Sequence, residues 1–260
     1  MSSVVPDLEK KSDHSLKSNV DSSAQPLLNH EALQAITTEQ FRDAHPYPWL
    51  NPESILTDSA FDLLRHNMPP KNQMKASFGR KRAHGQTPHD RYALEYCDGL
   101  EIHPAWHQLI DELNGPVYQA WLARLFDTDR FRLTYHWHYA PRGASVSPHC
   151  DAKRKLGSHI FYFNSHEEWS ADWGGETVIL DDDGEFSRSS APDFDDFKQA
   201  WPADAMGNRS LLFQRQGNSW HGVRELLCPE DRLRKVFIIV VNADTLGGRL
   251  RRLFHKPDGA

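Results

Sequence analysis

The sequence is poor in cysteine and has no long hydrophobic run. Its three cysteines, Cys97, Cys150 and Cys228, lie far apart and form no Cys-x-x-Cys pair. An odd and dispersed set argues against a disulfide scaffold or a structural zinc finger, and it favours a reducing compartment. The first twenty residues lack the apolar run of a signal peptide, and no stretch approaches membrane-spanning length. We therefore expect a soluble, cytoplasmic protein with no membrane partner.

An excess of positive charge is also missing. The 260 residues carry a formal net charge of −6. This balance argues against a dedicated nucleic-acid binder, so no nucleic-acid partner is expected. The length is sufficient for one well-buried core.

The chain divides into four stretches of different character. Residues 1–30 are polar and aperiodic, and they are predicted to be a disordered tail. Residues 31–129 contain apolar residues at helical spacing, which predicts supporting helices. Residues 130–246 are a series of strand-like runs separated by Gly, Asp and Asn, and residues 247–260 form a basic tail. We predict one domain over residues 31–246.

Helices followed by a run of strands indicate an α+β fold with a mainly β core. We predict a double-stranded β-helix (jelly roll) with supporting N-terminal helices. The stretch RFRLTYHWHYA (130–140) alternates, with aromatic residues on one face and His136 and His138 on the other. The apolar face is expected to look into the barrel, which would leave both histidines outside. A cupin-type metal site at this His-x-His pair would need a glutamate shortly afterwards, and the sequence has none there.

Three other residues are stronger candidates for metal ligands. His149 and Asp151 form a His-x-Asp pair after a Gly/Ser/Pro-containing turn, and the period of a strand places both on the same face. His221 lies in GNSWHGV, at a turn before a clear β-branched strand. Two histidines and one carboxylate make the facial triad that suits non-haem Fe(II) and leaves coordination positions open.

A cation follows the last of these candidates. Arg234 lies thirteen residues beyond His221 and opens the strand RKVFIIVVN. An arginine in this position can hold a carboxylate through two hydrogen bonds. Arg232 shares its face by the period of 2, and Lys235 faces the other way, so Arg232 remains a rival for the same role.

These elements together resemble the Fe(II)/2-oxoglutarate-dependent oxygenases, in particular the prolyl-4-hydroxylase-like branch. The resemblance covers about 130–244 and rests on Y-x9-HCD, IFYFN, WGGETVIL, GNSWHGV and RLRKVFIIVVN, which occur in the family's order and spacing. The single motifs are unspecific, but their combination is specific.

The resemblance implies a role for each of six residues. His149, Asp151 and His221 would be the iron ligands and the catalytic centre. Arg234 would bind the distal carboxylate of 2-oxoglutarate, and Tyr139 and Tyr162 would line the pocket of this co-substrate. Fe(II), 2-oxoglutarate and O2 would be required, with ascorbate as a candidate addition. The acid at position 151 implies hydroxylation of a C–H bond, with release of succinate and CO2.

Two alternatives and several properties stay open at this stage. The chain would otherwise be a cupin-type metalloenzyme that does not use 2-oxoglutarate, or a jelly-roll binding module without catalysis. The substrate is a prolyl residue, another protein side chain or a small molecule, and the oligomeric state is undetermined. The basic stretch KASFGRKRAHGQTPHDRY is expected to be a surface loop, and Arg91 and Tyr92 within it would contact substrate if the loop folds over the iron.

Overall fold

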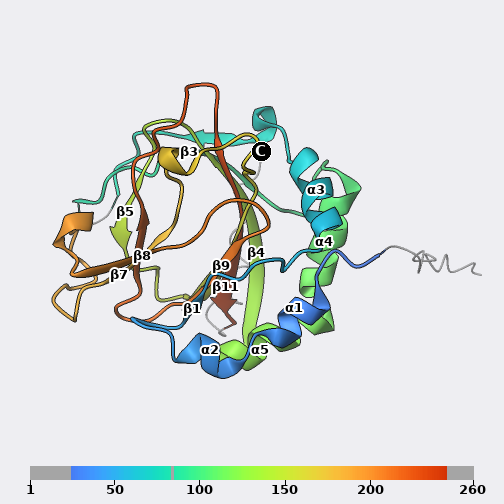
Figure 1. The fold of residues 1–260 in the computed structure, drawn as a ribbon, viewed down its shortest axis with the longest axis horizontal. Coiled ribbons are helices and arrows are strands. Elements are labelled where there is room, and N and C mark those ends of the chain that lie inside the picture. Colours follow the sequence, from blue (N-terminus) through green and yellow to red (C-terminus); the bar gives the residue numbers. More distant parts are fainter. Residues whose placement is uncertain (1–24, 83–84, 245–260) are drawn as a thin grey trace, which may run out of the picture.

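The computed structural model describes residues 25–82 and 85–244, and in this part of the chain two antiparallel sheets face each other. The larger sheet has seven strands in the order β1-β9-β6-β11-β4-β3-β2, and the smaller has four in the order β5-β10-β7-β8. Figure 1 shows the two sheets as a barrel-like core with all labelled helices on one side of it. This architecture confirms the predicted jelly roll with supporting helices.

The large sheet is built from β1 (Trp49–Leu50), β2 (Lys75–Ser77), β3 (Arg91–Glu95), β4 (Phe131–Ala140), β6 (Lys155–Tyr162), β9 (Ser210–Gln214) and β11 (Arg234–Ala243). The small sheet is built from β5 (Val146–His149), β7 (Val178–Asp181), β8 (Gln199–Pro202) and β10 (Trp220–Val223). The pairing of β11 with both β4 and β6 forms the centre of the large sheet. The predicted surface loop therefore contributes two strands, because β3 adds to the edge of β4 and β2 adds to β3.

The helices are α1 (His30–Ala35), α2 (Thr38–Arg42), α3 (Asp58–His66), α4 (Pro104–Asn114) and α5 (Pro116–Phe126), and short 3-10 turns cover Lys71–Gln73, Ala171–Trp173 and Phe194–Asp196. Local sequence sets several of their ends. Thr57 caps the start of α3, and a proline occupies the first turn of both α4 and α5. No helix in the described residues is both long and apolar enough to span a bilayer.

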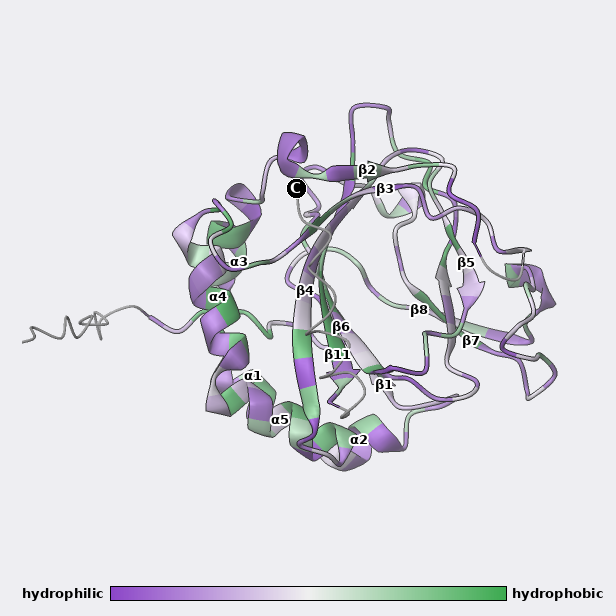
Figure 2. Cartoon of the chain, turned by 180° about the vertical axis from the view of Figure 1, so that it is seen from behind, coloured by the Kyte–Doolittle hydropathy of each residue, from purple (hydrophilic) through white to green (hydrophobic). Residues whose placement is uncertain are grey.

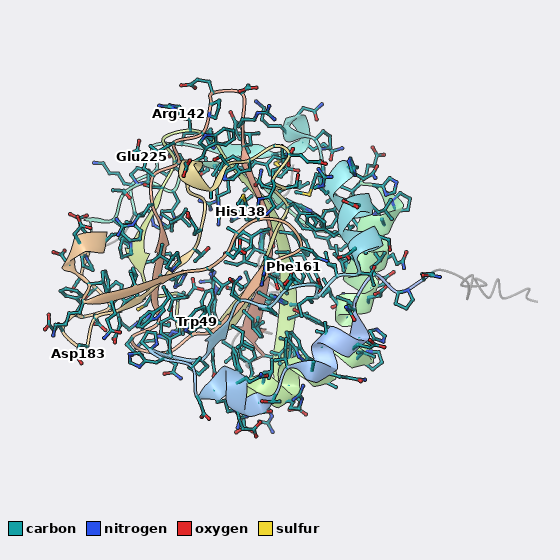
Figure 3. All side chains as sticks on the ribbon, viewed as in Figure 1. Trp49, His138, Arg142, Phe161, Asp183 and Glu225 are labelled. Carbon is teal, nitrogen blue, oxygen red and sulfur yellow. The ribbon has the colours of Figure 1, made fainter. Side chains whose placement is uncertain are left out.

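These helices cover the outer face of the large sheet, and this decides which side of β4 is apolar. Tyr135, Trp137 and Tyr139 pack into the core shared with α4 and α5. His138 points the other way and lines a cavity inside the barrel. Figure 3 shows His138 between the sheets and Phe161 towards the helices. The expectation that His136 and His138 lie outside the barrel is therefore wrong.

The physical reason is that this sheet has two covered faces. The outer one meets amphipathic helices, whose mixed hydropathy is visible in Figure 2, and it is therefore the more apolar face. The inner one surrounds a polar cavity. Alternation separates the two faces of a strand, but it does not say which of them faces the barrel.

Part of the stretch predicted to be a disordered N-terminal tail is folded. Leu27 and Leu28 are buried, and their backbone N–H groups donate to the carboxylate of Glu112 on α4 at 2.9–3.0 Å. Leu27 and Leu28 are thus part of the folded core. The rest of the predicted tail, like the predicted basic tail at 247–260, lies outside the described residues, and the single domain over 31–246 stays a prediction.

One buried histidine beneath the helices makes stability depend on pH. His159 on β6 is fully buried, and its Nδ1 lies 2.7 Å from the hydroxyl of Tyr118. Its Nε2 has no hydrogen-bond partner within the described part of the chain. Burial lowers the pKa of His159 to about 3, so the folded protein keeps this ring neutral where the unfolded chain would protonate it.

We expect this histidine to weaken the fold in mild acid. Its folded pKa lies below its unfolded value of about 6.5, so the unfolded state gains protons as the pH falls below that value. The free energy of unfolding should lose about 2 kcal/mol from His159 between pH ~7.5 and pH ~5. Urea unfolding of the metal-free protein at these two pH values measures the loss. His159→Gln should lose about 2 kcal/mol less than the wild type, and an equal loss in both proteins would contradict this assignment.

Candidate functional site

Strand pairing brings three of the predicted site residues together. His149 ends β5 and lies directly opposite His221 of β10 in the small sheet. Asp151 follows two residues later, beyond the strand end. One potential ligand atom from each residue lies within 4.8 Å of the others, and the two imidazole centroids are 4.4 Å apart. All three residues line one cavity of about 230 Å³ inside the barrel.

Backbone carbonyls fix the tautomers of both histidines. Nδ1 of His149 lies 3.0 Å from the carbonyl oxygen of Ser147, and Nδ1 of His221 lies 3.0 Å from that of Ser219. A carbonyl can only accept, so Nδ1 of each ring carries the proton and Nε2 keeps its lone pair. A histidine held in this way by its second nitrogen is a typical metal ligand.

The carboxylate between the histidines is held by a lysine. Lys155 donates to Oδ1 of Asp151 at 2.7 Å, and the Ser158 hydroxyl lies 3.4 Å from Oδ2. Burial raises the pKa of Asp151, but Lys155, His221 and His149 outweigh it and bring the value to about 2. Burial, reinforced by His221, lowers the pKa of His149 to about 3. At neutral pH the site therefore offers two neutral imidazoles and one ionised carboxylate, which is the protonation state that a divalent metal requires.

A buried cation shares the cavity with these three groups. Arg234, at the start of β11, is only 9% exposed. Its Nε donates to the carbonyl of Gly175, and one terminal nitrogen lies 3.4 Å from the Thr177 hydroxyl. Both partners are neutral, and among the described residues no acid forms an ion pair with it. An arginine buried in this way is costly unless an anion is bound beside it.

Tyr162 lies next to this arginine. The guanidinium carbon of Arg234 is 5.6 Å from the centre of the Tyr162 ring, which is buried on the inner face of β6. Within the described residues, the hydroxyl of Tyr162 makes no hydrogen bond of good geometry, although Thr177 lies beside it. Burial raises the pKa of this phenol, so it stays a donor. Arg234 and Tyr162 are thus neighbouring donors, of which Arg234 lines the cavity of the triad.

Three further residues of the sequence prediction lie elsewhere. Tyr139 is on the helix side of β4, where its hydroxyl donates to the carbonyl of Pro69 at 2.6 Å. The prediction that Tyr139 lines the co-substrate pocket is therefore wrong, for the same reason as the reversed faces of β4. The Arg232 side chain is 45% exposed and pairs with Asp231, so this rival of Arg234 does not line the cavity. Lys235 pairs with Glu168 and does not line it either.

The structure also adds residues that the motifs did not indicate. Lys155 and Ser158 contact the acid of the triad, and His138, Arg82 and His89 line the same cavity. Only Lys155 left a signal in the sequence, as a basic residue four positions after Asp151. Ser158 lies three residues further along the same strand, whereas Arg82 and His89 come from a segment that has no fixed spacing to the triad.

Comparisons with known proteins agree with this geometry. Residues 134–240 match the family model described as the 2OG-Fe(II) oxygenase superfamily. A prolyl-4-hydroxylase from Pseudomonas putida is structurally similar, with a TM-score of 0.56 and 16% identity over 80% of this chain and 99% of that one. A prolyl hydroxylase from Trichoplax adhaerens, in complex with a peptide fragment of the hypoxia inducible factor, has a TM-score of 0.59 and 12% identity over 87% and 94% of the two chains.

A third similar structure has a different reaction in its name. It is the non-heme alpha ketoglutarate dependent carbocyclase SnoK from nogalamycin biosynthesis, with a TM-score of 0.55 and 10% identity over 88% of this chain and 94% of that one. No curated protein matches the chain at a significant level of sequence similarity. At these identities the structural likenesses show a shared fold.

Proposed function

We propose that the chain is a dioxygenase that hydroxylates a C–H bond, because residues 134–240 match the model of the 2OG-Fe(II) oxygenase superfamily, whose members use Fe(II), 2-oxoglutarate and O2. In this proposal Nε2 of His149, Nε2 of His221 and the carboxylate of Asp151 hold the iron. The donor set fits, because two imidazoles and one carboxylate leave coordination positions open for co-substrate and oxygen. When bound, the iron supplies the oxidising power, and each turnover converts one 2-oxoglutarate and one O2 into succinate, CO2 and a hydroxyl group on the substrate.

The protein's own residues bind, orient and exclude water. Arg234 and Tyr162 would hold the distal carboxylate of 2-oxoglutarate and so direct its keto acid end towards the triad. Lys155 keeps one oxygen of Asp151 engaged, which leaves the other as the ligand atom. Apolar side chains, including Ile160, Phe213 and Val236, line the same cavity and limit the water near the reacting bond.

One observation carries the proposal: a buried arginine without an acidic partner lines the same cavity as the triad. It favours the proposal over a cupin-type metalloenzyme that does not use 2-oxoglutarate, since such an enzyme has no use for a carboxylate site there. A binding module without catalysis is disfavoured by the three convergent ligand atoms and by the fixed histidine tautomers.

The substrate classes that we propose are a prolyl residue, another protein side chain or a small molecule. The likeness to two prolyl hydroxylases supports the first, and the likeness to a carbocyclase from a biosynthetic pathway supports the last.

The test is succinate formation from 2-oxoglutarate under air. We expect the purified protein with added Fe(II) to form succinate slowly without substrate and faster with the correct substrate, and to form none after the metal is removed with a chelator. Metal-dependent turnover of another kind, without succinate, would support the cupin-type alternative. Iron binding with no succinate in any condition would support the binding module.

A further inference from the structure

Besides Arg234, a second group of cations lines the cavity that contains His149, Asp151 and His221, and it lies on the segment that leads into β3. Arg82 and Arg91 are both half-buried and both face this cavity. Their hydrogen bonds go to neutral groups: Arg82 donates to Oε1 of Gln86 at 3.2 Å and to Nδ1 of His89 at 2.9 Å, and Arg91 donates to the carbonyl of His89 at 2.9 Å. Among the described residues, no acid forms an ion pair with either guanidinium.

Hydrogen-bond donors are left over in this group. A guanidinium can only donate, so Nδ1 of His89 is the acceptor and its proton is on Nε2. This Nε2 is buried without a partner in the described structure, and so is Nε of Arg91. Buried donors without acceptors are rare in native proteins and call for an explanation, such as a ligand. Burial, followed by the charges of Arg82 and Arg80, lowers the pKa of Arg91, as expected for a half-buried cation with other cations close to it.

The group lies beside the proposed iron site and comes from a different segment than the carboxylate site of Arg234, and His89 and Arg91 adjoin Arg234 in one small cavity. The centre of the His89 ring is 5.2 Å from that of the His149 ring. His89, which is hydrogen-bonded to both arginines, therefore lies between them and the triad. Arg234 and its partners belong to β11 and to the segment before β7. If Arg234 holds the distal carboxylate of 2-oxoglutarate, the hydrogen-bond acceptor for Arg82, His89 and Arg91 must belong to another molecule.

The cavity continues beyond this group into a larger polar one. A second cavity of about 730 Å³ shares Arg91, His138 and Lys155 with the first. Its lining adds Arg154 and a single acid, Glu95, within the described residues. The whole chain has a net charge of −6, but the charged residues that line these cavities are mainly cations. The local positive charge therefore favours the binding of anionic ligands inside the barrel.

We propose that Arg82, His89 and Arg91 bind an oxyanion of the substrate, a phosphate or carboxylate group, and so place a neighbouring C–H bond at the iron. The substrate is then an anionic molecule whose body extends into the larger polar cavity. This deepens the proposed function and rests on it, since the reacting bond is the one presented to the triad. A neutral substrate would leave the arginines without a counter-charge on binding, at a cost in affinity.

The test uses Mn(II) as a redox-inert substitute for Fe(II). Protein in excess of Mn(II), saturated with 2-oxoglutarate so that Arg234 is occupied, is titrated with inorganic phosphate or with acetate. Paramagnetic relaxation of the ³¹P or methyl ¹H signal reports anion bound near the metal. In the wild type we expect the relaxation of at least one of the two anions to saturate as its concentration rises. Arg91→Gln and Arg82→Gln should each bind this anion at least about tenfold more weakly, because each variant loses one charge-assisted hydrogen bond.

Arg80→Gln is the matched control, because Arg80 is exposed on the same segment and does not line the cavity. It should bind the anion as the wild type does. Saturation by phosphate alone indicates a phosphate ester substrate, and saturation by acetate indicates a carboxylic acid. The inference is overturned if neither anion binds to protein that has bound Mn(II) and 2-oxoglutarate, or if all three variants weaken binding equally. Failure to bind Mn(II) and 2-oxoglutarate at all would instead count against the proposed function.

Discussion

The variant His221→Ala is expected to bind Fe(II) at least about 100-fold more weakly than the wild type and to form no measurable succinate. Loss of a residue that only supports a metal ligand already costs about 10- to 100-fold in affinity, and here a ligand itself is removed. His221 is buried with its tautomer fixed by Ser219, so no neighbouring group can take over its lone pair without rearrangement. Equilibrium titration with Fe(II) under nitrogen, followed by the aerobic succinate assay, measures both losses.

A histidine elsewhere in the barrel provides the control. His136 lies on the same face of β4 as His138 and lines only the larger cavity, away from the three converging ligand atoms. His136→Gln should therefore keep its iron affinity within a factor of about three. Full turnover in His221→Ala, or equal losses in the two variants, would remove His221 from the metal site.

The second large effect is expected on 2-oxoglutarate. Arg234→Met should raise the KM for 2-oxoglutarate about 100-fold, because two charge-assisted hydrogen bonds of about 1.5 kcal/mol each are lost. The Kd for Fe(II) should change by less than about threefold, since Arg234 does not contact the triad. Steady-state kinetics at varied 2-oxoglutarate and a separate metal titration distinguish the two effects.

Two further variants sharpen this prediction. Arg234→Lys should recover part of the affinity, because an ammonium keeps the charge but not the two parallel hydrogen bonds of a guanidinium. Arg232→Ala should behave as the wild type, since the Arg232 side chain is 45% exposed and pairs with Asp231. A rise in KM for 2-oxoglutarate in Arg232→Ala, with Arg234→Met unaffected, would show that the anchor was assigned to the wrong arginine.

Strong local patterns in the sequence were sufficient to predict most of the core. The alternation of β4 and the β-branched run of β11 are strands because their side chains alternate between two covered faces. The proline starts of α4 and α5 follow from the fixed φ of proline. Strands β2 and β3 were missed because their polar sequence carries no apolar alternation, and they become strands through pairing at the edge of β4.

The residues of the candidate site were likewise predicted only in part. The spacing of His149 and Asp151 and the strand context of His221 were enough to expect convergence, and register places the two histidines opposite each other. The prediction for Tyr139 was wrong because the two-residue period of a strand does not specify which of its faces points into the barrel. Lys155, His89 and Arg82 were not predicted as site residues because tertiary packing, and no motif, brings them to the cavity.

The proposed metal and co-substrate sites can be tested directly by a crystal structure of the protein soaked with Mn(II) and 2-oxoglutarate, with the metal located by its anomalous signal. We expect one peak bounded by His149, Asp151 and His221, with the distal carboxylate of 2-oxoglutarate on Arg234 and Tyr162. A metal held by other side chains, for example at His89, or 2-oxoglutarate bound away from Arg234, would contradict this expectation.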